Sequence, residues 1–458
     1  MEELKKMNLN IPSFKAYDIR GRIPDELNSK MAYRIANAMA DFLQAKTVIL
    51  GRDIRASSEE LANAVADGLM DAGVDVIDIG LCGTEGVYFA TGNLSACGGI
   101  MVTASHNPSD YNGMKLVRDK AKPIGAETGL RDIRCLAESE NRYLSKKKGN
   151  RTFKDISEPY IKRILNFVNN ELLKPLKIVV NPGNGGAGLV IDQLEDCLPF
   201  DFVKVHFEPD ASFPNGVPNP MIEENRVSTA DAVLEHKADL GIAWDGDFDR
   251  CFFFDEKGKF IEGYYIVGLL AESFLKKNKS ENIIYDPRLT WNTIDTVIKA
   301  GGKPIQSQSG HSFIKQSMRE NDAIYGGEMS AHHYFRDFYY CDSGMVPWLL
   351  VAELISVTGK KLSTMLDICR TNYPVSGEIN RTVSDTERTI TKIHSQYKDD
   401  ALLIDTMDGV SMEFSDWRFN VRASNTEPLL RLNVESRGDQ ALMESKTNKL
   451  LEIIDLEG

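Results

Sequence analysis

The chain has 458 residues, of which 42% are hydrophobic and 26% charged, so it is long enough for several domains and lacks the composition of a disordered protein. Its formal net charge of −13 argues against a general attraction to nucleic acid or to an anionic membrane, although a local basic pocket can still bind a phosphorylated metabolite. No apolar stretch is long enough to span a bilayer, MEELKKMNLN has no apolar signal segment, and no cysteine pair has CxxC spacing, so we expect a cytoplasmic protein.

The first part of the chain, residues 1–150, alternates helical and strand-like patterns. A helical pattern begins at Asn28, TVILG reads as a buried strand, and Ser57 with Glu60 predicts a capping box that opens a second helix ending at Gly73. A strand, a helix and a strand are then expected at 74–80, 84–92 and 98–103. Strands separated by single helices predict a layered α/β domain.

Three further domains are expected, at 151–253, 254–370 and 371–458. The first two repeat the α/β pattern, with the strands KIVV and GIAW in one and IIYD, KPIQS and AIYGG in the other. Beyond Thr371 a strand, a helix, two or three antiparallel strands and a terminal helix indicate a smaller α+β domain. The predicted fold class is therefore α/β, with three similar α/β domains and a C-terminal α+β domain.

A turn containing a serine follows the strand at 98–103. Ser105 lies in the segment TASHNP, where the Asn-Pro pair predicts a turn that exposes the serine hydroxyl. An exposed hydroxyl can act as a nucleophile, whereas the plainer interpretation is a turn whose Ser and Asn side chains only bond backbone groups. A serine hydrolase is not favoured, because the G-x-S-x-G motif is absent and no triad partner is evident.

Three aspartates spaced by two, Asp245, Asp247 and Asp249, follow an apolar segment. Because Trp244 and the phenylalanines at 252–254 flank them, we expect the carboxylates to lie in a partly desolvated pocket, where a cation must offset their repulsion. Mg²⁺ prefers such oxygen ligands. The sequence therefore predicts a magnesium site rather than a solvated acidic turn.

A calcium-binding EF-hand loop is the rival interpretation of this segment. Glu256 is at the twelfth position counted from Asp245, as that loop requires. However, Arg250 stands at the sixth position, where the loop demands glycine, and strand-like segments replace the flanking helices. Arg250 beside the metal is better explained as a ligand of phosphate oxygens.

Two polar loops later in the chain suit a phosphorylated polyol. Glu328 and Ser330 in GGEMS can bond adjacent sugar hydroxyls, with SGH and His311 upstream. The loop RASNTEP, which begins at Arg422, concentrates guanidinium, hydroxyl and amide donors and predicts a phosphate site without metal. Taken alone, the first loop can also be a packed segment. The second can also be a hairpin turn whose polar side chains form hydrogen bonds within the turn.

A glycine-rich segment, GNGGAG at 183–188, matches the dinucleotide-binding pattern G-x-G-x-x-G after the strand KIVVN. Glu208 follows it at about the spacing expected for the ribose-binding acid. Against this interpretation, Pro182 sits in the turn and the proline-rich FPNGVPNP follows. A nicotinamide-dependent oxidoreductase is therefore kept only as an alternative of another class.

A nucleophilic hydroxyl, three aspartates, a polyol loop and a separate phosphate loop together indicate phosphoryl transfer on a phosphosugar. In the same order and along essentially the whole chain, these motifs resemble the α-D-phosphohexomutase superfamily, most of all its bacterial phosphomannomutase branch. The matching segments are FKAYDIRG at 14–21, TASHNP with GMK at 113–115, DGDFDR, GEMS with SGH, and RASNTEP. The resemblance implies four domains that each contribute one loop to a central cleft.

The resemblance also implies roles for single residues. It makes Ser105 the phosphoserine, with Mg²⁺ held by a phosphoserine oxygen and by Asp245, Asp247 and Asp249. Glu328 and Ser330 are implied to bind O3 and O4 of the sugar. The phosphate that is not transferred is implied to be bound by Arg422, Ser424, Asn425 and Thr426. Further cleft positions are Tyr17, Arg20, Lys115, Arg250 and His311, and the candidates for proton handling or substrate orientation are Lys115, His106 and His311.

Two residues depart from the family pattern. Ala331 stands where many relatives have glycine after GEMS, and Arg288, a candidate substrate-binding residue, stands where some have lysine. Each can adjust specificity for the sugar. The implied reaction interconverts mannose 6-phosphate and mannose 1-phosphate, which serves GDP-mannose and polysaccharide synthesis.

A hexose 1,6-bisphosphate is the implied intermediate and activator. Phosphoglucomutase, phosphoglucosamine mutase and dual-specificity mutases are alternatives within the same chemistry. The expected partner is a phosphosugar, with no nucleic acid or membrane partner, and the sequence does not indicate an oligomeric state.

Overall fold

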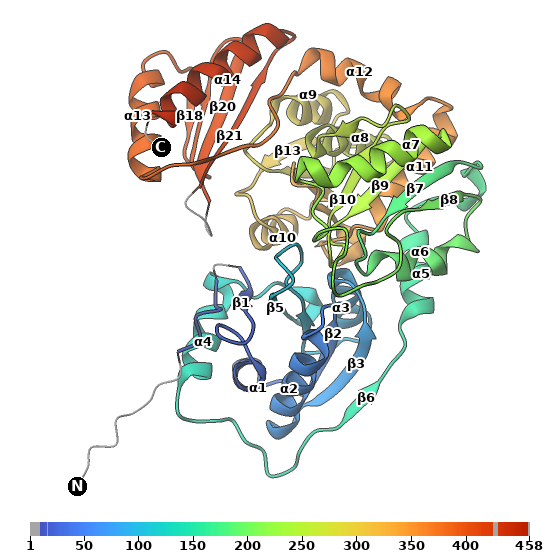
Figure 1. Cartoon of the computed structure of the whole chain (residues 1–458), viewed down its shortest axis with the longest axis vertical. Helices are drawn as coiled ribbons and strands as arrows, with labels where there is room; N and C mark the ends of the chain where they lie inside the picture. The colour runs from blue at the N-terminus through green and yellow to red at the C-terminus, as the bar shows by residue number, and fades with distance from the viewer. Residues whose placement is uncertain (1–9, 16, 425–428, 457–458) are drawn as a thin grey trace. The chain divides into compact units, whose positions relative to one another are not determined.

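The computed structural model describes residues 10–15, 17–424 and 429–456. Its contacts divide the chain into two compact units (Figure 1). The first unit is the chain up to Gly258 together with Asp337–Val357, and the second is Lys259–Arg336 together with the chain from Thr358 onward. Each unit is described by itself.

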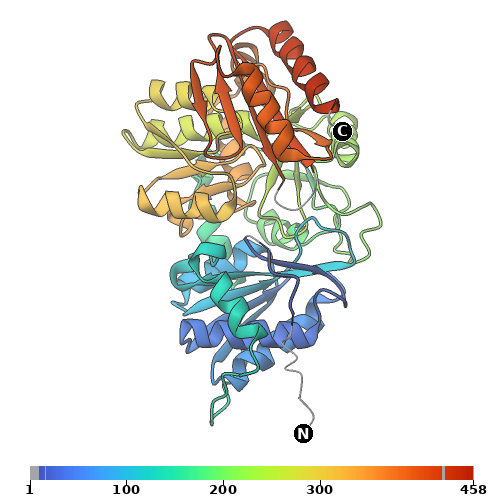
Figure 2. The ribbon, with the colours of Figure 1, turned by 90° about the vertical axis from the view of Figure 1, so that its left-hand side faces the viewer.

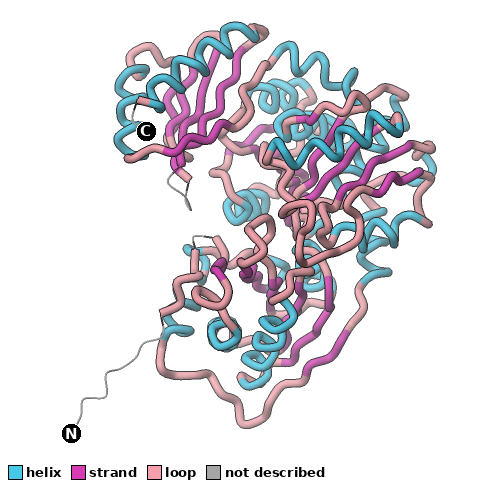
Figure 3. Tube along the Cα trace, viewed as in Figure 1, coloured by secondary structure: helices cyan, strands magenta, loops and turns pink. Residues whose placement is uncertain are grey.

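The first unit opens with a six-stranded sheet in the order β1-β5-β4-β2-β3-β6. Its strands are β1 (Ile19–Arg22), β2 (Thr47–Arg52), β3 (Asp75–Leu81), β4 (Gly98–Val102), β5 (Tyr111–Arg118) and β6 (Arg151–Phe153). Its helices are α1 (Ser29–Leu43), α2 (Ser58–Asp71), α3 (Thr84–Asn93) and α4 (Leu130–Glu138). Strands β2, β3, β4 and β6 are parallel, while β5 runs antiparallel to β4 and β1. Figure 3 colours the strands of the chain magenta and its helices cyan. The predicted alternation is confirmed, and β1, β5 and β6 are strands that the pattern did not reveal.

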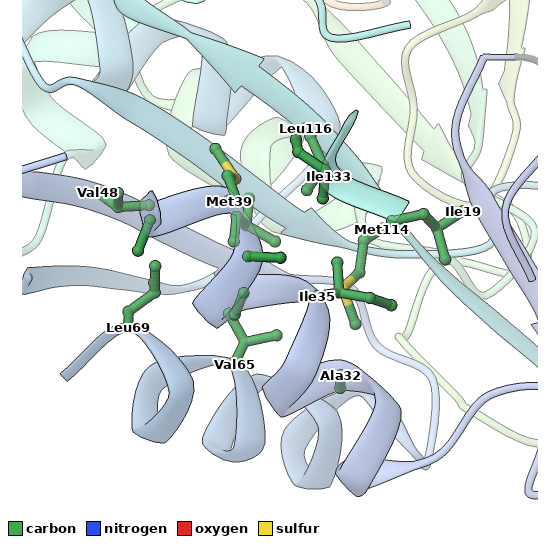
Figure 4. Packing of buried hydrophobic residues seen from close by; sticks show 14 of the residues in the cluster. Ile19, Ala32, Ile35, Met39, Val48, Val65, Leu69, Met114, Leu116 and Ile133 are labelled. Atoms are coloured by element: carbon green, nitrogen blue, oxygen red, sulfur yellow. The ribbon is translucent and has the colours of Figure 1, made fainter. Parts of the chain in front are cut away.

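The core of this part lies between the sheet and the helices α1, α2 and α4. Ile35 and Met39 on α1, one turn apart, pack with Val65 and Leu69 on α2, and all four are fully buried (Figure 4). Val48 of β2 joins them from the sheet, as alternation along a strand requires. Helix α1 begins where the sequence predicted, because the Asn28 side chain accepts the Met31 N–H.

The predicted capping box of α2 is wrong, although the helix itself is confirmed. The Ser57 side chain makes no capping bond, and its hydroxyl instead accepts from Asn112 Nδ2 at 2.8 Å. The Glu60 carboxylate accepts from the Ser29 hydroxyl instead of reaching back to the helix start. Hydrogen bonds to residues that are distant in the sequence therefore replace the two predicted capping bonds.

The remainder of the first unit contains four strands of a second, five-stranded α/β sheet, in the order β10-β9-β7-β8. Its strands are β7 (Lys177–Asn181), β8 (Asp201–Lys204), β9 (Leu240–Trp244) and β10 (Cys251–Phe254). The accompanying elements are α5 (Ser157–Leu165), α6 (Ala187–Glu195), α7 (Val227–His236), β16 (Cys341–Asp342) and α11 (Val346–Thr358). β7, β8 and β9 are parallel, and β10 turns back antiparallel on β9.

The second unit begins with an α/β segment. Its strands are β11 (Phe260–Ile261), β12 (Asn282–Tyr285), β13 (Lys303–Gln306), β14 (Tyr325–Gly327) and β15 (His333–Phe335). Its helices are α8 (Gly263–Lys277), α9 (Trp291–Lys299), α10 (His311–Glu320) and α12 (Leu362–Asn372). β12 pairs in parallel with β13 and β14, and β15 is antiparallel to β14, so the three predicted strands are confirmed.

The C-terminal part of the second unit has the α+β character that the sequence predicted. Its antiparallel sheet has the order β17-β21-β20-β19-β18. The strands are β17 (Ile379–Thr382), β18 (Leu403–Asp405), β19 (Val410–Glu413), β20 (Trp417–Ala423) and β21 (Leu429–Ser436). Helices α13 (Thr386–Tyr397) and α14 (Gln440–Asp455) contact each other and the sheet (Figure 2).

The fold places three of the predicted functional loops at strand ends. Ser105 follows β4, Asp245 follows β9 and Glu328 follows β14. In open α/β sheets this is where ligands bind.

Candidate active site

Ser105 has a strained backbone and an engaged hydroxyl. Its φ of 50° lies in the left-handed region, which costs a non-glycine residue about 1–2 kcal/mol. The hydroxyl donates to Asp245 Oδ2 at 2.8 Å and lies 3.1 Å from His106 Nδ1. The residue is only 1% exposed. The expectation of an exposed hydroxyl is therefore wrong. The loop that carries Asp245, Asp247 and Asp249, called here the aspartate loop, covers the serine.

Arg55, which no sequence pattern singled out, holds in place the loop that carries Ser105, called here the serine loop. It is buried, and its two terminal nitrogens donate to four backbone carbonyl oxygens at 2.6 to 3.0 Å. These oxygens belong to Ser105, Asn107, Pro108 and Tyr111. The Asp53 carboxylate lies 3.4 Å from Arg55 Nε and balances its charge. Such a clamp supports the unfavourable backbone conformation of the serine.

The three predicted metal ligands converge in the turn between β9 and β10. Asp245, Asp247 and Asp249 are buried, and one oxygen from each lies within 4.8 Å of the others. Two strands flank the turn, with Trp244 paired to Cys251 in the antiparallel ladder. A calcium-binding hand requires helices on either side of its loop, so the EF-hand alternative is wrong.

The donor set fits a hard divalent cation. Burial, followed by the charges of Asp249 and Asp247, raises the pKa of Asp245 to about 7, because three carboxylates share a site that is shielded from water. Asp247 Oδ1 is buried and has no hydrogen-bond partner among the described residues. An oxygen cluster with an unpaired buried carboxylate oxygen matches what Mg²⁺ requires.

Lys115 lies in β5 and contacts two of these aspartates. Its Nζ donates to Asp247 Oδ2 at 2.7 Å and also to Asp249. Burial alone would lower the pKa of Lys115, but the charges of Asp247 and Asp249 outweigh burial and raise that pKa above its ordinary value. Lys115 is therefore a charged hydrogen-bond donor at neutral pH.

Three further predicted residues surround the serine loop. Arg20 donates to the Asn107 side chain at 2.6 Å, and Arg250 Nε lies 3.6 Å from Asp245 Oδ2. Loss of water contact, together with the charges of Arg250 and Arg20, lowers the pKa of His106 well below its usual range. His106 is therefore neutral near pH 7.

The glycine-rich segment 183–188 serves the aspartate loop and does not resemble a phosphate cradle. The N–H groups of Asn184, Gly185 and Gly186 donate to the carbonyl oxygens of His206, Pro182 and Gly246. Because a dinucleotide site needs these N–H groups for the pyrophosphate, the structural context that would support an oxidoreductase is missing. The segment instead buttresses the turn that carries the aspartates.

Glu85 is a second buried group that the sequence did not single out. It lies in α3, and its carboxylate accepts hydrogen bonds from the Tyr160 hydroxyl and from the N–H groups of Gly344 at 2.6 Å and Met345 at 3.3 Å. Burial raises the pKa of Glu85 to about 7, although the hydrogen bonds act in the opposite direction. The carboxyl thus links α3 to α5 and to the start of α11.

We expect Glu85→Gln to remove a pH-dependent loss of stability. Because the folded-state pKa of Glu85 is raised from 4.5 to about 7, only the folded state keeps this proton between those pH values. The wild-type free energy of unfolding should therefore fall by up to about 1.4 kcal/mol per pH unit as pH rises through that window. Denaturant unfolding of the wild type and of Glu85→Gln from about pH 5 to 7 measures this pH dependence. A difference in unfolding free energy between the two proteins that does not change with pH contradicts the prediction.

The loop after β14 orients Glu328 in the second unit. Its Oε1 accepts the Gly310 N–H at 2.9 Å, and its Oε2 accepts from the Tyr334 hydroxyl at 2.6 Å. Glu328 is buried, and His311 begins the helix that follows Gly310. The carboxylate is thus fixed in one orientation, as a group that recognises particular hydroxyls must be.

Arg288 is tied into the same loop. It makes a two-point ion pair with Asp286 at 2.9 and 3.0 Å and contacts Glu328 Oε1 at 3.3 Å and Ser330 Oγ at 3.2 Å. Asp286 also accepts the Met329 N–H at 2.8 Å. Burial alone would lower the pKa of Arg288, but the charge of Asp286 and then that of Glu328 raise it. Arg288 therefore shapes the predicted sugar loop by holding both of its polar side chains.

The predicted phosphate loop brings together more guanidinium groups than the sequence suggested. Arg422 in β20 lies directly opposite Arg431 in β21, an arrangement that is unfavourable unless an anion lies nearby. Glu378 supplies that anion, at 3.2 Å from Arg422 and 3.4 Å from Arg431. Burial alone would raise the pKa of Glu378, but Arg288 first, and then these two arginines, lower it.

The predicted site residues thus fall into two groups. The first unit gathers Arg20, Ser105, His106, Lys115, Asp245, Asp247, Asp249 and Arg250. Tyr17, half-buried, precedes Asp18, which is ion-paired with Arg20. The second unit holds Arg288, His311, Glu328, Ser330, Arg422 and Ser424. Asn425 and Thr426 lie outside the described residues.

Four sequence families match the chain in succession. They are described as phosphoglucomutase/phosphomannomutase alpha/beta/alpha domain I at residues 12–143, domain II at 158–258, domain III at 262–373, and the C-terminal domain at 378–450. In the described part of the chain, every helix is too short or too polar to cross a bilayer.

Curated relatives match over nearly their full length. A protein of Escherichia coli strain K12 named phosphomannomutase is 55% identical, with 96% of this chain and 98% of the relative covered. A protein of Xanthomonas campestris strain B100 named phosphohexose mutases is 54% identical over 97% of this chain and 100% of the relative.

Solved structures share the fold. A phosphoglucomutase/phosphomannomutase family protein from Burkholderia thailandensis has a TM-score of 0.88 at 31% identity and covers 98% of both chains. The phosphoglucomutase parafusin from Paramecium has a TM-score of 0.79 at 16% identity, covering 97% of this chain and 95% of the other.

Proposed function

This chain belongs to the phosphoglucomutase/phosphomannomutase family, and from that premise we propose that it interconverts mannose 6-phosphate and mannose 1-phosphate through a phosphorylated Ser105. The observation that carries the proposal is the 2.8 Å hydrogen bond from the Ser105 hydroxyl to Asp245, within a buried cluster of three aspartates. It brings a nucleophile and a set of cation ligands into contact, which phosphoryl transfer requires.

Asp245, Asp247 and Asp249 would hold Mg²⁺ together with a phosphoserine oxygen. When bound, the ion offsets negative charge on the phosphoryl group. Arg20 and Arg250 reinforce this from the rim of the same site, since both lie beside the serine and aspartate loops. The protein's contribution is to align these groups in a site shielded from water.

The cycle begins with phospho-Ser105. The bond between phosphorus and the serine oxygen breaks as a sugar hydroxyl bonds to phosphorus and loses its proton, which gives a hexose 1,6-bisphosphate and a free serine hydroxyl. After the bisphosphate turns around, Ser105 takes the other phosphoryl group and the isomer leaves. The candidates for proton handling or substrate orientation are His106, Lys115 and His311; His106 Nδ1 lies 3.1 Å from the Ser105 hydroxyl oxygen, and Lys115 is a charged hydrogen-bond donor.

The second unit would recognise the sugar and its other phosphate. Glu328 and Ser330, held by Arg288, would bind O3 and O4 in either orientation of the sugar. The remaining phosphate would be bound by Arg422, Ser424, Asn425 and Thr426, and Tyr17 and His311 remain predicted substrate contacts, each within its own unit. We assign these loops to four domains, 1–150, 151–253, 254–370 and 371–458, in a cytoplasmic enzyme activated by hexose 1,6-bisphosphate.

A dual-specificity mutase is the second candidate function. It is favoured by the Xanthomonas relatives at 54% identity, whose name covers phosphohexoses in general. Turnover of mannose 1-phosphate, glucose 1-phosphate and glucosamine 1-phosphate, measured side by side, separates the candidates. The proposal predicts the highest kcat/KM for mannose 1-phosphate, and a preference for glucosamine 1-phosphate contradicts it.

Removal of the metal is expected to abolish turnover. Without a divalent ion, the carboxylates of Asp245, Asp247 and Asp249 repel the phosphoryl group. The transition state then loses electrostatic stabilisation, which raises the activation free energy of phosphoryl transfer by several kcal/mol. The assay compares turnover of enzyme treated with a chelator before and after Mg²⁺ is added back. Activity that persists after the chelator, at a level near that of untreated enzyme, rules out a metal-dependent reaction.

A further inference from the structure

Thr84, the first residue of α3, contacts the aspartate loop twice. It is fully buried, and its hydroxyl donates to Asp247 Oδ2 at 2.6 Å. Its backbone N–H also donates, at 3.2 Å, to the Asp247 carbonyl oxygen. One residue therefore holds both the side chain and the backbone of a proposed metal ligand.

These contacts decide which carboxylate oxygen of Asp247 remains available. Oδ2 accepts from Thr84 and from Lys115 Nζ, the latter at 2.7 Å. Oδ1 is buried and has no hydrogen-bond partner among the described residues. We propose that Thr84 is a positioning residue that fixes Asp247 with Oδ1 directed to the divalent ion, an inference that rests on the proposed metal-dependent function.

The directions of the hydrogen bonds explain why residue 84 needs a hydroxyl group, which can both accept and donate a hydrogen bond. Lys115 Nζ lies 3.4 Å from Thr84 Oγ1 and has only protons to offer, so the threonine oxygen accepts from the lysine and gives its own proton to Asp247. Valine has the same shape but can neither accept nor donate. Replacing the hydroxyl by a methyl group would leave Asp247 Oδ2 with the lysine alone and free the carboxylate to rotate.

The approach of α3 to the loop is too close for the contact to be incidental. A Cβ atom at Gly83 would lie 2.2 Å from the ring of Phe248, so the chain reaches this turn only because the preceding residue is glycine. The contact thus joins the start of α3, which follows β3, to the turn that follows β9. Groups that orient metal ligands in this way typically change metal affinity by about 10- to 100-fold when removed.

The test measures Mg²⁺ affinity of the full-length protein by isothermal titration calorimetry. Thr84→Val should weaken Mg²⁺ binding by about 10- to 100-fold, and Thr84→Ser, which keeps the hydroxyl, should restore affinity close to that of the wild type. Thr91→Val is the matched control. Thr91 is also fully buried in α3, but its hydroxyl donates to the Val87 carbonyl oxygen at 2.7 Å inside the helix. This variant should keep wild-type affinity even if its stability falls.

Several outcomes overturn the inference. Unchanged Mg²⁺ affinity in Thr84→Val, or an equal loss in Thr84→Val and Thr91→Val, shows that Thr84 acts only through packing. If Thr84→Val does not fold, Thr84→Ala and Thr91→Ala form the pair to which the same criteria apply. A wild-type protein without saturable Mg²⁺ binding contradicts the proposed metal site itself, and with it this inference, whereas normal wild-type binding with an unaffected Thr84→Val contradicts the inference alone.

Discussion

Replacing Ser105 with alanine is expected to abolish mutase turnover, by at least about 10³-fold, while the phosphosugar still binds. The serine oxygen is the only atom of the protein that the proposed cycle phosphorylates, so neither half of the reaction can proceed without it. Arg55 donates to the backbone carbonyl oxygen of the serine, a contact that alanine keeps, whereas the hydrogen bond from the serine hydroxyl to Asp245 is lost. Steady-state turnover of mannose 1-phosphate and its calorimetric affinity for the variant measure the two parts of this expectation.

Ser95→Ala provides the matched control for this substitution. Ser95 has a φ of 52°, nearly that of Ser105, but it is exposed and follows the end of α3. Both substitutions therefore place alanine in the same left-handed conformation. Turnover of Ser95→Ala should match the wild type, and near-normal turnover of Ser105→Ala would show that the serine is not the phosphoryl carrier.

Arg55→Lys is expected to lower kcat by about 10²-fold with little change in KM, because the substitution displaces the nucleophile without removing it. Lysine keeps a positive charge beside Asp53, but a single ammonium group cannot reach the four carbonyl oxygens that the two terminal nitrogens of Arg55 contact. Ser105 would then relax from its left-handed backbone conformation and move relative to Asp245. Steady-state kinetics measures both constants.

Arg34→Lys serves as the control for the loss of a buried guanidinium. Arg34 is also buried in the first unit and donates to the carbonyl oxygens of Ala137 and Ser139, far along the chain from the serine loop. Its substitution should lower stability but leave kcat close to that of the wild type. Similar kcat values for the Arg55 and Arg34 variants would contradict the proposed role of Arg55.

Local patterns were sufficient for most of the fold. The helical spacing after Asn28 predicted α1, and short apolar runs bounded by turns predicted β2, β4, β7, β9 and β12. The chemistry-bearing loops were also visible, because Ser105, Asp245 and Glu328 directly follow such strands. A catalytic loop at the end of a strand can be recognised in the sequence as a cluster of polar residues that follows an apolar segment.

The supporting contacts were not predictable, because they join distant parts of the chain. Arg55 precedes Ser105 by 50 residues, and Thr84 precedes Asp247 by 163. Glu378 and Arg431 meet Arg422 only through the register of β17, β21 and β20. The same limit explains the errors on Ser57, whose cap was replaced by a bond from Asn112, and on the exposure of Ser105, which a distant loop covers.

The most direct test of the phosphoserine mechanism is the intact mass of the purified protein, recorded before and after incubation with a hexose 1,6-bisphosphate. We expect a single added phosphoryl group that peptide mapping places on Ser105, that is lost on addition of excess hexose 1-phosphate, and that never forms in Ser105→Ala. A protein that turns over substrate without any adduct, or with the adduct on another residue, would contradict the phosphoserine mechanism.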